Sequence, residues 1–176
     1  MVAALMEQLQ GYSAKVLAVA LLAAALAKLA KPAAFKSTVR MLGVGRFAAA
    51  VAFAVPAAEA VLGMGFALPV LRVYVEVAAT LLFAVFAGVA LQAIRAGKRV
   101  RCSCFGNSES RLGWQTVVSN AVLIMLVWLA ARRPVAPAGV LAEIRMWLGA
   151  AALVTMAAIV GHVMSSWKNL EVPASD

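Results

Sequence analysis

The sequence predicts an all-α membrane protein, a polytopic bundle of transmembrane helices in which residues 1–176 form a single membrane domain. Hydrophobic residues make up 65% of the chain and charged residues only 13%, and the mean hydropathy of +0.95 is above that of water-soluble domains. The apolar residues also form long blocks, and about 20 such residues cross a bilayer core of about 30 Å. Strand-like alternation is absent from these blocks, and a helix satisfies its own backbone hydrogen bonds in lipid, so we expect helical spans.

Five apolar blocks follow one another along the chain, joined by short connections. The first block leads into further membrane segments rather than into a cleavage site and a soluble domain, so we expect a span and not a signal peptide. Small residues in the first block (LAVALLAAALAKLA) and the sequence GMG at 63–65 would let neighbouring helices approach closely. We predict spans at residues 12–30, 45–67, 70–95, 115–132 and 140–162.

The formal net charge of +9 comes from basic residues that lie in loops and at span ends. This distribution indicates membrane topology rather than nucleic-acid binding. Most of these residues surround the first loop, the third loop and the tail, namely Lys28, Lys31, Lys36, Arg40, Arg46, Arg95, Lys98, Arg99, Arg101, Arg111 and Lys168. By the positive-inside rule, these segments are cytoplasmic and the N-terminus is outside.

Among the ionisable residues within the predicted spans, Lys15, Glu59 and Glu76 stand out, because an unpaired charge in lipid costs at least about 2.5 to 3.5 kcal/mol. At about 1.5 Å per residue, Glu59 lies roughly 10 Å before the end of its span and Glu76 roughly 9 Å after the start of the next. Both therefore lie toward the leaflet that Lys15 enters, and a pair between Lys15 and Glu59 or Glu76 is geometrically available, which is a hypothesis about packing. A structural interpretation is that these groups form an ion pair or reach the lipid headgroups. A functional interpretation is that they form a proton or quinone site, and both interpretations stay open.

The only two cysteines of the chain lie in the stretch KRVRCSCFGNSESRLGW, residues 98–114. Cys102 and Cys104 are separated by one serine, which places their Cα atoms near the upper end of the range of about 4.4 to 6.8 Å that a disulfide tolerates. A disulfide closed there would be strained, and strained, exposed disulfides are more oxidising and tend to be catalytic or labile. Cys102 and Cys104 are therefore the candidate catalytic residues of a thiol-disulfide exchange site.

The residues around the two cysteines support this interpretation. A positive field favours the thiolate, which is the nucleophile in disulfide exchange. Aromatic and turn-forming residues follow the pair, and Trp114 opens the fourth predicted span, so we expect the pair at a membrane surface. The supporting residues in this loop are Lys98, Arg99, Arg101, Phe105 and Gly106.

The two cysteines have two other interpretations. The thiols could be inert, small apolar side chains, with the basic residues acting only as a topology signal. Two soft thiolates could also hold Cu(I), Hg(II) or Zn(II). The sequence has one histidine and no second cysteine pair, whereas a closed zinc site needs four donors, so we predict no resident metal.

Several segments, taken in order, resemble the motifs of one family. The segment LAKLAKPAAF, which contains Lys28, is similar to that family's basic segment before a proline at the end of span one. The segment VPAAEAVLGMGFAL places Glu59 at the glutamate of an LPxxExxLGxxL element, and IRAGKRVRCSCFG is similar to an R-G-x-x-x-x-C-x-C-F-G signature. The segment SNAVLIMLVWLA is similar to the start of span four. Over roughly residues 17–130 the chain thus resembles the MauE family of methylamine utilisation membrane proteins, which belong with DoxX-like four-helix membrane domains.

The chain departs from the family pattern at two positions. Ser103 stands where the family usually has a glycine, which lowers the backbone freedom for closing a small ring. Ser119 precedes Asn120 where an arginine is usual, so any anion or substrate contact of that arginine is in doubt. The last predicted span lies beyond the shared region, and we therefore expect a four-helix DoxX-like core plus a fifth transmembrane helix.

The resemblance implies a membrane thiol-disulfide protein that assists maturation or disulfide formation of an exported partner, of the methylamine dehydrogenase small-subunit type. It further implies a thioredoxin-like partner, a location in the cell (inner) membrane, and supporting roles for Lys28, Glu59 and Asn120. The electron acceptor stays unassigned. A quinone is one candidate, because the layout is similar to that of the vitamin K epoxide reductase and DsbB groups, which is an architectural analogy.

Two inferences disagree about the side of the membrane on which the cysteine loop lies. The distribution of charge places it in the cytoplasm, whereas disulfide formation belongs to the oxidising compartment outside. A cytoplasmic pair favours an alternative function, a soft-metal or sulfur-compound permease or carrier that uses the same thiols.

Overall fold

The computed structural model describes residues 2–67, 72–97, 113–131 and 140–170 of the chain. Within these residues it contains helices and no strand, which confirms the all-α prediction. In chain order the elements are α1 (Val2–Ala30), α2 (Pro32–Met41), the 3-10 helix η1 (Gly45–Phe47), α3 (Ala48–Ala67), α4 (Arg72–Arg95), α5 (Trp114–Ala130) and α6 (Val140–Leu170).

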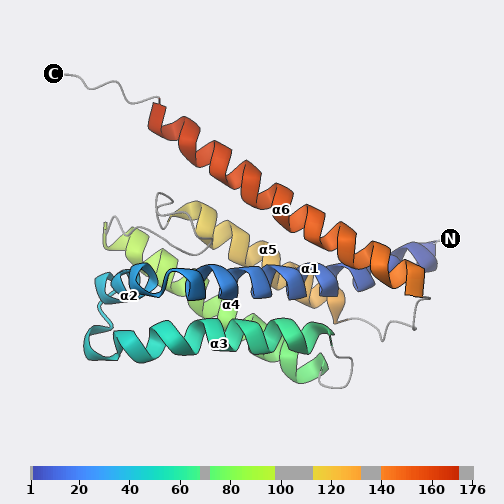
Figure 1. Cartoon of the computed structure of the whole chain (residues 1–176), viewed down its shortest axis with the longest axis horizontal. Helices are drawn as coiled ribbons and strands as arrows, with labels where there is room; N and C mark the ends of the chain where they lie inside the picture. The colour runs from blue at the N-terminus through green and yellow to red at the C-terminus, as the bar shows by residue number, and fades with distance from the viewer. Residues whose placement is uncertain (1, 68–71, 98–112, 132–139, 171–176) are drawn as a thin grey trace.

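Helices α1, α3, α4 and α5 form the bundle, and α1 occupies its centre (Figure 1). α1 packs against α3, α5 and α6, while α4 packs along α5. The core contains apolar side chains from α1, α4 and α5 that are almost completely buried, and Leu17, Ala79 and Val127 have exposures of 0%, 0% and 1%. The pair of α1 with α3 and the pair of α4 with α5 are thus held together by apolar packing around α1.

Glycine makes the contact between α1 and α3 close. A Cβ atom added at Gly63 would lie 2.9 Å from Cγ of Leu22 and 3.1 Å from the carbonyl oxygen of Ala18. Both distances are shorter than ordinary van der Waals contacts, so only a residue without a side chain fits there at this helix separation. Close approach through small residues is the usual way in which helices associate in lipid.

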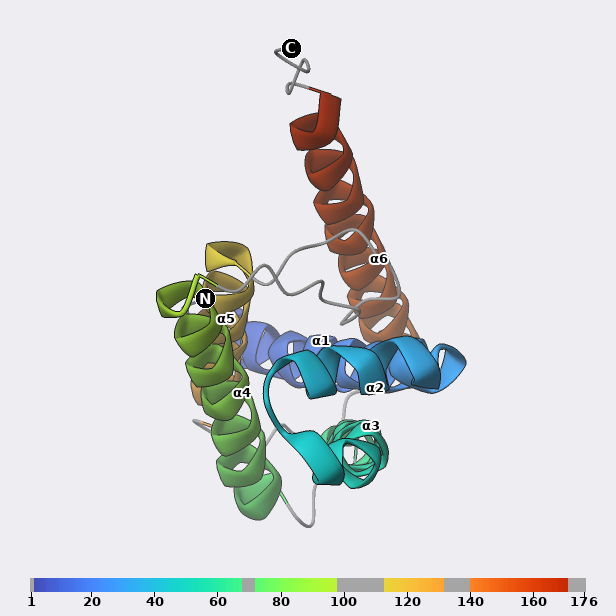
Figure 2. The same cartoon turned by 90° about the vertical axis from the view of Figure 1, so that its left-hand side faces the viewer.

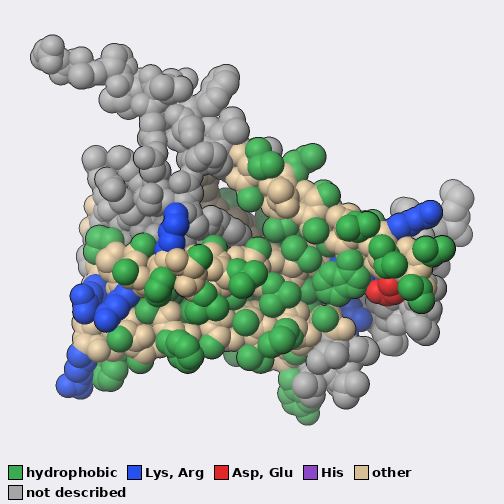
Figure 3. Space-filling view, viewed as in Figure 1, with side chains coloured by type: hydrophobic (Ala, Val, Ile, Leu, Met, Phe, Trp, Pro, Cys, Tyr) green, Lys and Arg blue, Asp and Glu red, His purple; other side chains and the backbone are tan. Residues whose placement is uncertain are grey.

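The outer surface of the bundle is apolar, as expected for a chain surrounded by lipid (Figure 3). Large side chains such as Phe53, Tyr74 and Met125 are 71%, 77% and 71% exposed. Three described segments are long and apolar enough to cross a membrane, namely Gly11–Ala30, Gly45–Ala67 and Arg72–Arg95. The protein is therefore a multi-pass membrane protein, and membrane crossing by the shorter apolar helix α5 and by α6 stays a prediction.

A helix that the sequence analysis did not anticipate connects the first two spans. α2 begins with Pro32 in its first turn, where a missing N–H group costs nothing. Phe35, Thr38 and Val39 are buried on one face of the helix, and Phe35 and Val39 pack in one cluster with Ala48 of α3. α2 is thus a short amphipathic helix fixed to the first half of α3.

α6 contacts the bundle mainly through its first half and then diverges from it (Figure 2). The two helices approach closely at this contact, since a Cβ atom added at Gly149 would lie 2.7 Å from the hydroxyl oxygen of Tyr12 in α1. Ala150 is fully buried at this contact, whereas Leu153, Met156 and Ile159 further along the helix are more than half exposed.

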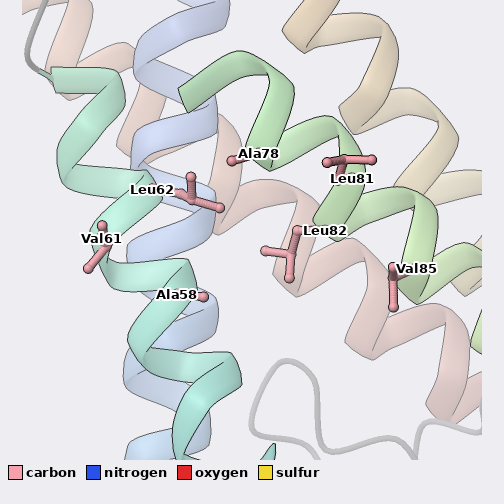
Figure 4. Close-up of a pocket in the computed structure, with 7 residues that line it drawn as sticks. All are labelled: Ala58, Val61, Leu62, Ala78, Leu81, Leu82 and Val85. Carbon is pink, nitrogen blue, oxygen red and sulfur yellow. The ribbon is translucent and has the colours of Figure 1, made fainter. Parts of the chain in front are cut away.

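α3 and α4 diverge enough to leave a groove of about 360 Å³ between them, open at the surface of the bundle (Figure 4). Its lining contains no polar side chain, so the described residues offer nothing there that would hydrogen-bond a polar headgroup. The lining consists of Ala58, Val61 and Leu62 from α3 and Ala78, Leu81, Leu82 and Val85 from α4.

Candidate functional site

The bundle encloses a buried ion pair between Lys28 of α1 and Glu59 of α3, here named the central ion pair. The Nζ atom of Lys28 donates to both carboxylate oxygens of Glu59, at 2.7 Å to Oε1 and 2.8 Å to Oε2. A third, longer hydrogen bond of 3.5 Å runs from Nζ to the carbonyl oxygen of Ala24 one turn earlier. The two side chains are only 3% and 2% exposed. Each charge is therefore neutralised inside the protein.

Two aromatic rings complete the surroundings of the Lys28 ammonium group. Nζ lies 5.6 Å from the ring centroid of Phe35 in α2 and 5.9 Å from that of Phe86 in α4. An ammonium group within about 6 Å of a ring face is attracted by the negative potential of that face. The central ion pair and its two rings thus connect α1, α2, α3 and α4 at one point.

Glu59 lies well inside its candidate membrane segment, whereas Lys28 lies two residues before the end of the segment Gly11–Ala30. At about 1.5 Å per residue, Glu59 is roughly 21 Å from the start of the segment Gly45–Ala67 and roughly 12 Å from its end. Phe86 likewise lies well inside the segment Arg72–Arg95. An unpaired charge at this depth would be strongly unfavourable, so the pairing is needed for the bundle to accommodate either residue.

The predicted partner of Lys15 was wrong. Lys15 binds Glu143 of α6 at 2.9 Å, and its Nζ lies 5.9 Å from the ring centroid of Trp147. At about 100° per residue, Lys15 and Lys28 lie about 140° apart around α1, so the face that carries Lys15 meets α6 while Lys28 meets α3. We name the contact of Lys15 with Glu143 the peripheral ion pair.

Glu76 also has a partner other than the predicted one. Its Oε1 atom accepts a hydrogen bond of 3.2 Å from Nε of Arg72, one turn earlier on α4. The guanidinium group of Arg72 also donates from Nη2 to the carbonyl oxygen of Ala130, at 2.8 Å. Arg72 and Glu76 thereby hold the end of α5 against the start of α4.

The cysteine loop joins α4 to α5 at the end of the bundle that also carries α2 (Figure 1). α4 ends at Arg95, the turn after it contains Gly97 with a φ of +62°, and Gly113 caps the start of α5. The residues between these two glycines lie outside the described part of the chain. They include the predicted site residues Lys98, Arg99, Arg101, Cys102, Cys104, Phe105 and Gly106.

Asn120, the remaining predicted site residue, is buried in α5. Its Nδ2 atom donates to the carbonyl oxygen of Thr116 one turn earlier, at 2.7 Å. Ser119, which stands where the family usually has arginine, is exposed and bonds to the same carbonyl at 3.1 Å. Among the described residues, no group of three or more histidine, cysteine or carboxylate side chains could hold a metal ion.

Sequence reasoning named Lys28 and Glu59 but did not connect them, and it missed Phe35 and Phe86. Lys28 was counted with the basic residues that surround the first loop. A usable signal was present, because Lys28 lies inside the first predicted span, and a buried lysine in an apolar helix requires a carboxylate nearby. Nothing in the sequence distinguished the two rings from other apolar residues of the spans.

Comparison with known proteins identifies the family. The family model described as methylamine utilisation protein MauE matches residues 6–133, which is more than half of the chain and contains the central ion pair and both cysteines. No curated protein matches the chain significantly. No solved structure does so either. α6 begins after the matched region. By this match the chain belongs to the MauE family of methylamine utilisation proteins.

Proposed function

We propose that this membrane protein of methylamine utilisation is a thiol-disulfide protein that assists the maturation of an exported, disulfide-containing partner. Cys102 and Cys104 are its exchanging pair. The observation that carries the proposal is the Cys102-Ser103-Cys104-Phe105-Gly106 sequence, the most specific element of the family resemblance, in a loop between two packed helices. The partner is of the methylamine dehydrogenase small-subunit type, a thioredoxin-like protein acts with it, and the bundle resides in the cell's inner membrane.

The bundle supports this role because the two helices that the loop connects pack against each other. α4 and α5 pack along each other, with Phe83 of α4 and Val127 of α5 3% and 1% exposed in the common core. At the end of the two helices opposite the loop, Nη2 of Arg72 donates a hydrogen bond to the carbonyl oxygen of Ala130. The loop that carries the two cysteines is thus attached at both ends to helices that pack against each other.

The proposed chemistry is disulfide exchange in two steps. A thiolate of the pair attacks one sulfur of a partner disulfide, which forms a mixed disulfide and releases a partner thiolate. The second cysteine of the pair then attacks the sulfur of the first cysteine. This breaks the mixed disulfide, releases the second partner thiolate and forms the Cys102-Cys104 disulfide. Two electrons pass from the pair to the partner. The reverse sequence oxidises a partner dithiol and leaves the pair reduced.

Other residues have supporting roles in this proposal. Lys98, Arg99 and Arg101 favour the thiolate by their positive field, since the thiolate is the attacking species. Phe105, Gly106 and Asn120 shape the loop and the start of α5. Lys28 and Glu59 brace α1 against α3 through the central ion pair, which has no net charge.

One observation favours a second candidate, a soft-metal or sulfur-compound permease or carrier that uses the same thiols. Basic side chains gather at the end of the bundle that carries α2 (Figure 3). Lys36 and Arg40 lie on α2, Arg46 lies in η1, and Arg95 is the last residue of α4, after which the cysteine loop follows in the sequence. By the positive-inside rule this end is cytoplasmic, where thiols are kept reduced.

Replacement of each cysteine by serine tests the proposed function. In cells that express only Cys102→Ser or Cys104→Ser, we expect the exported partner to lose its correct disulfides while the variant still accumulates in the membrane. Ser103→Gly, which restores the family's usual residue, is the matched control and should retain activity. Partner maturation at the wild-type level in both serine variants would rule out the exchange mechanism.

A further inference from the structure

The segment between the first two spans carries a basic surface. α2 lies between the membrane segments Gly11–Ala30 and Gly45–Ala67, and η1 forms the first residues of the second segment, so both are located where the chain turns between two spans. α2 buries Phe35 and Val39 against the first half of α3, and this packing directs its other face away from the bundle.

The outward face combines cations with exposed apolar side chains. Lys36 and Arg40 are one helical turn apart on α2, and Arg46 follows in η1 with its Cζ atom 4.9 Å from the ring centroid of Phe47. Arg40 and Arg46 are exposed, and so are Met41 and Phe47, at 47% and 57%. We name Lys36, Arg40 and Arg46, with these two apolar side chains, the basic α2 surface.

No carboxylate within the described part of the chain neutralises these three cations. The sequence contains no acidic residue between Glu7 and Glu59. The described carboxylates are bound elsewhere, Glu59 by Lys28, Glu76 by Arg72 and Glu143 by Lys15. The basic α2 surface therefore presents a cluster of positive charge whose counterions come from outside these residues.

We propose that the basic α2 surface binds the headgroup phosphates of anionic phospholipids. Arginine and lysine donate charge-assisted hydrogen bonds to phosphate, and basic residues beside a membrane attract anionic lipid. Met41 and Phe47 reach the boundary between headgroups and acyl chains, as the apolar side chains of interfacial helices do. A lipid is favoured over an acidic protein segment, because exposed apolar side chains lie directly beside the cations at the level where a membrane segment begins.

Lipid binding at this surface would act on the rest of the bundle through α2. Phe35, on the opposite face of the helix, lies 5.6 Å from the Lys28 ammonium group in the central ion pair. The bound headgroups would hold α2 against α3 and so keep this ring in place. This inference does not depend on the proposed exchange chemistry.

A lipid titration of the purified full-length protein tests the proposal. Native mass spectrometry would compare binding of phosphatidylglycerol with that of phosphatidylcholine carrying the same acyl chains. We expect preferential phosphatidylglycerol binding by the wild type. In the triple variant K36Q/R40Q/R46Q we expect a loss of about fivefold per removed charge, on the order of 100-fold in total.

The matched control is the triple variant R132Q/R133Q/R145Q, which removes the same charge from the other loop ends. It should retain most of the preference for phosphatidylglycerol. Equal losses in both triple variants would mean that net charge alone controls binding and would overturn the proposal. Equal binding of the two lipids by the wild type would also overturn the proposal. So would a K36Q/R40Q/R46Q variant that keeps its lipid preference but loses a copurifying acidic protein, because the surface would then bind that protein.

Discussion

α1 carries two lysines, and each binds a glutamate of another helix, but the two ion pairs differ in burial. In the central ion pair Lys28 and Glu59 are 3% and 2% exposed, whereas in the peripheral ion pair Lys15 and Glu143 are 11% and 38% exposed. The first joins α1 to α3 inside the family-matched region, and the second joins α1 to α6, which begins after that region. Burial decides what a pair does, because a buried charge cannot be left unpaired whereas an exposed charge can be solvated.

Breaking the central ion pair should have the largest effect. In Glu59→Leu the ammonium group of Lys28 would remain buried without a carboxylate, and in Lys28→Met the carboxylate would remain without a cation. We expect either change to lower the free energy of unfolding by about 3 to 5 kcal/mol. Unfolding of the purified protein by titration with sodium dodecyl sulfate, followed by circular dichroism, measures this.

The double variant K28M/E59L is the matched control for this prediction. It removes both charges and leaves apolar side chains of similar volume, so it should be much more stable than either single variant. Single variants that are no less stable than the double variant would show that Lys28 and Glu59 do not depend on each other.

Glycine substitutions at the contacts of α1 with α3 and with α6 should lower the free energy of unfolding by smaller amounts, which should differ between the two contacts. Gly63→Ala would push a Cβ atom against Leu22 and the backbone of Ala18, and overpacking of this kind costs about 1 to 3 kcal/mol. Gly149→Ala should cost less, because its nearest neighbour is the hydroxyl end of the flexible Tyr12 side chain. The same unfolding titration measures both.

Gly88→Ala is the control for these substitutions, because nothing lies within 4 Å of its added Cβ atom. This change should be neutral or slightly stabilising, since alanine favours a helix by about 1 kcal/mol over glycine. A greater loss of stability in Gly149→Ala than in Gly63→Ala would contradict the view that the contact of α1 with α3 is the tighter of the two.

Removal of the peripheral ion pair should have the smallest effect. In Glu143→Gln we expect a loss of about 0.2 to 1 kcal/mol, because Glu143 is partly exposed and such pairs are screened by salt. Repeating the unfolding titration at high ionic strength should abolish this difference but leave that of Glu59→Leu intact, since burial shields the central ion pair from ions. If high ionic strength reduced the stability loss equally in Glu143→Gln and Glu59→Leu, the two ion pairs would not differ in their shielding from solvent.

The fold class could be predicted from the sequence because it depends on hydropathy and length, which are local properties. The apolar segments Gly11–Ala30, Gly45–Ala67 and Arg72–Arg95 are visible without knowledge of how the helices pack. α2 could have been predicted as well, since Pro32 is a helix-starting signal and Phe35 and Val39 are one turn apart.

The partners of the charged residues could not be derived in the same way. Assigning Lys28 to Glu59 requires the rotation of α1 about its axis and the identity of the helix that each face meets, and neither is encoded in a single segment. The prediction for Lys15 failed for this reason, because only the leaflet was considered. Its real partner, Glu143, lies on a helix whose contact with α1 was not foreseen. The predicted roles of Cys102 and Cys104 remain a proposal.

Thiol labelling tests the proposed function most directly, because Cys102 and Cys104 are the only cysteines in the chain. Intact cells or spheroplasts would be treated with a membrane-impermeant maleimide before and after reduction, with the two serine variants as controls. We expect labelling from outside only after reduction, which would reveal an extracytoplasmic disulfide. Free thiols that react only after permeabilisation would contradict the maturation role and favour a cytoplasmic thiol or metal carrier.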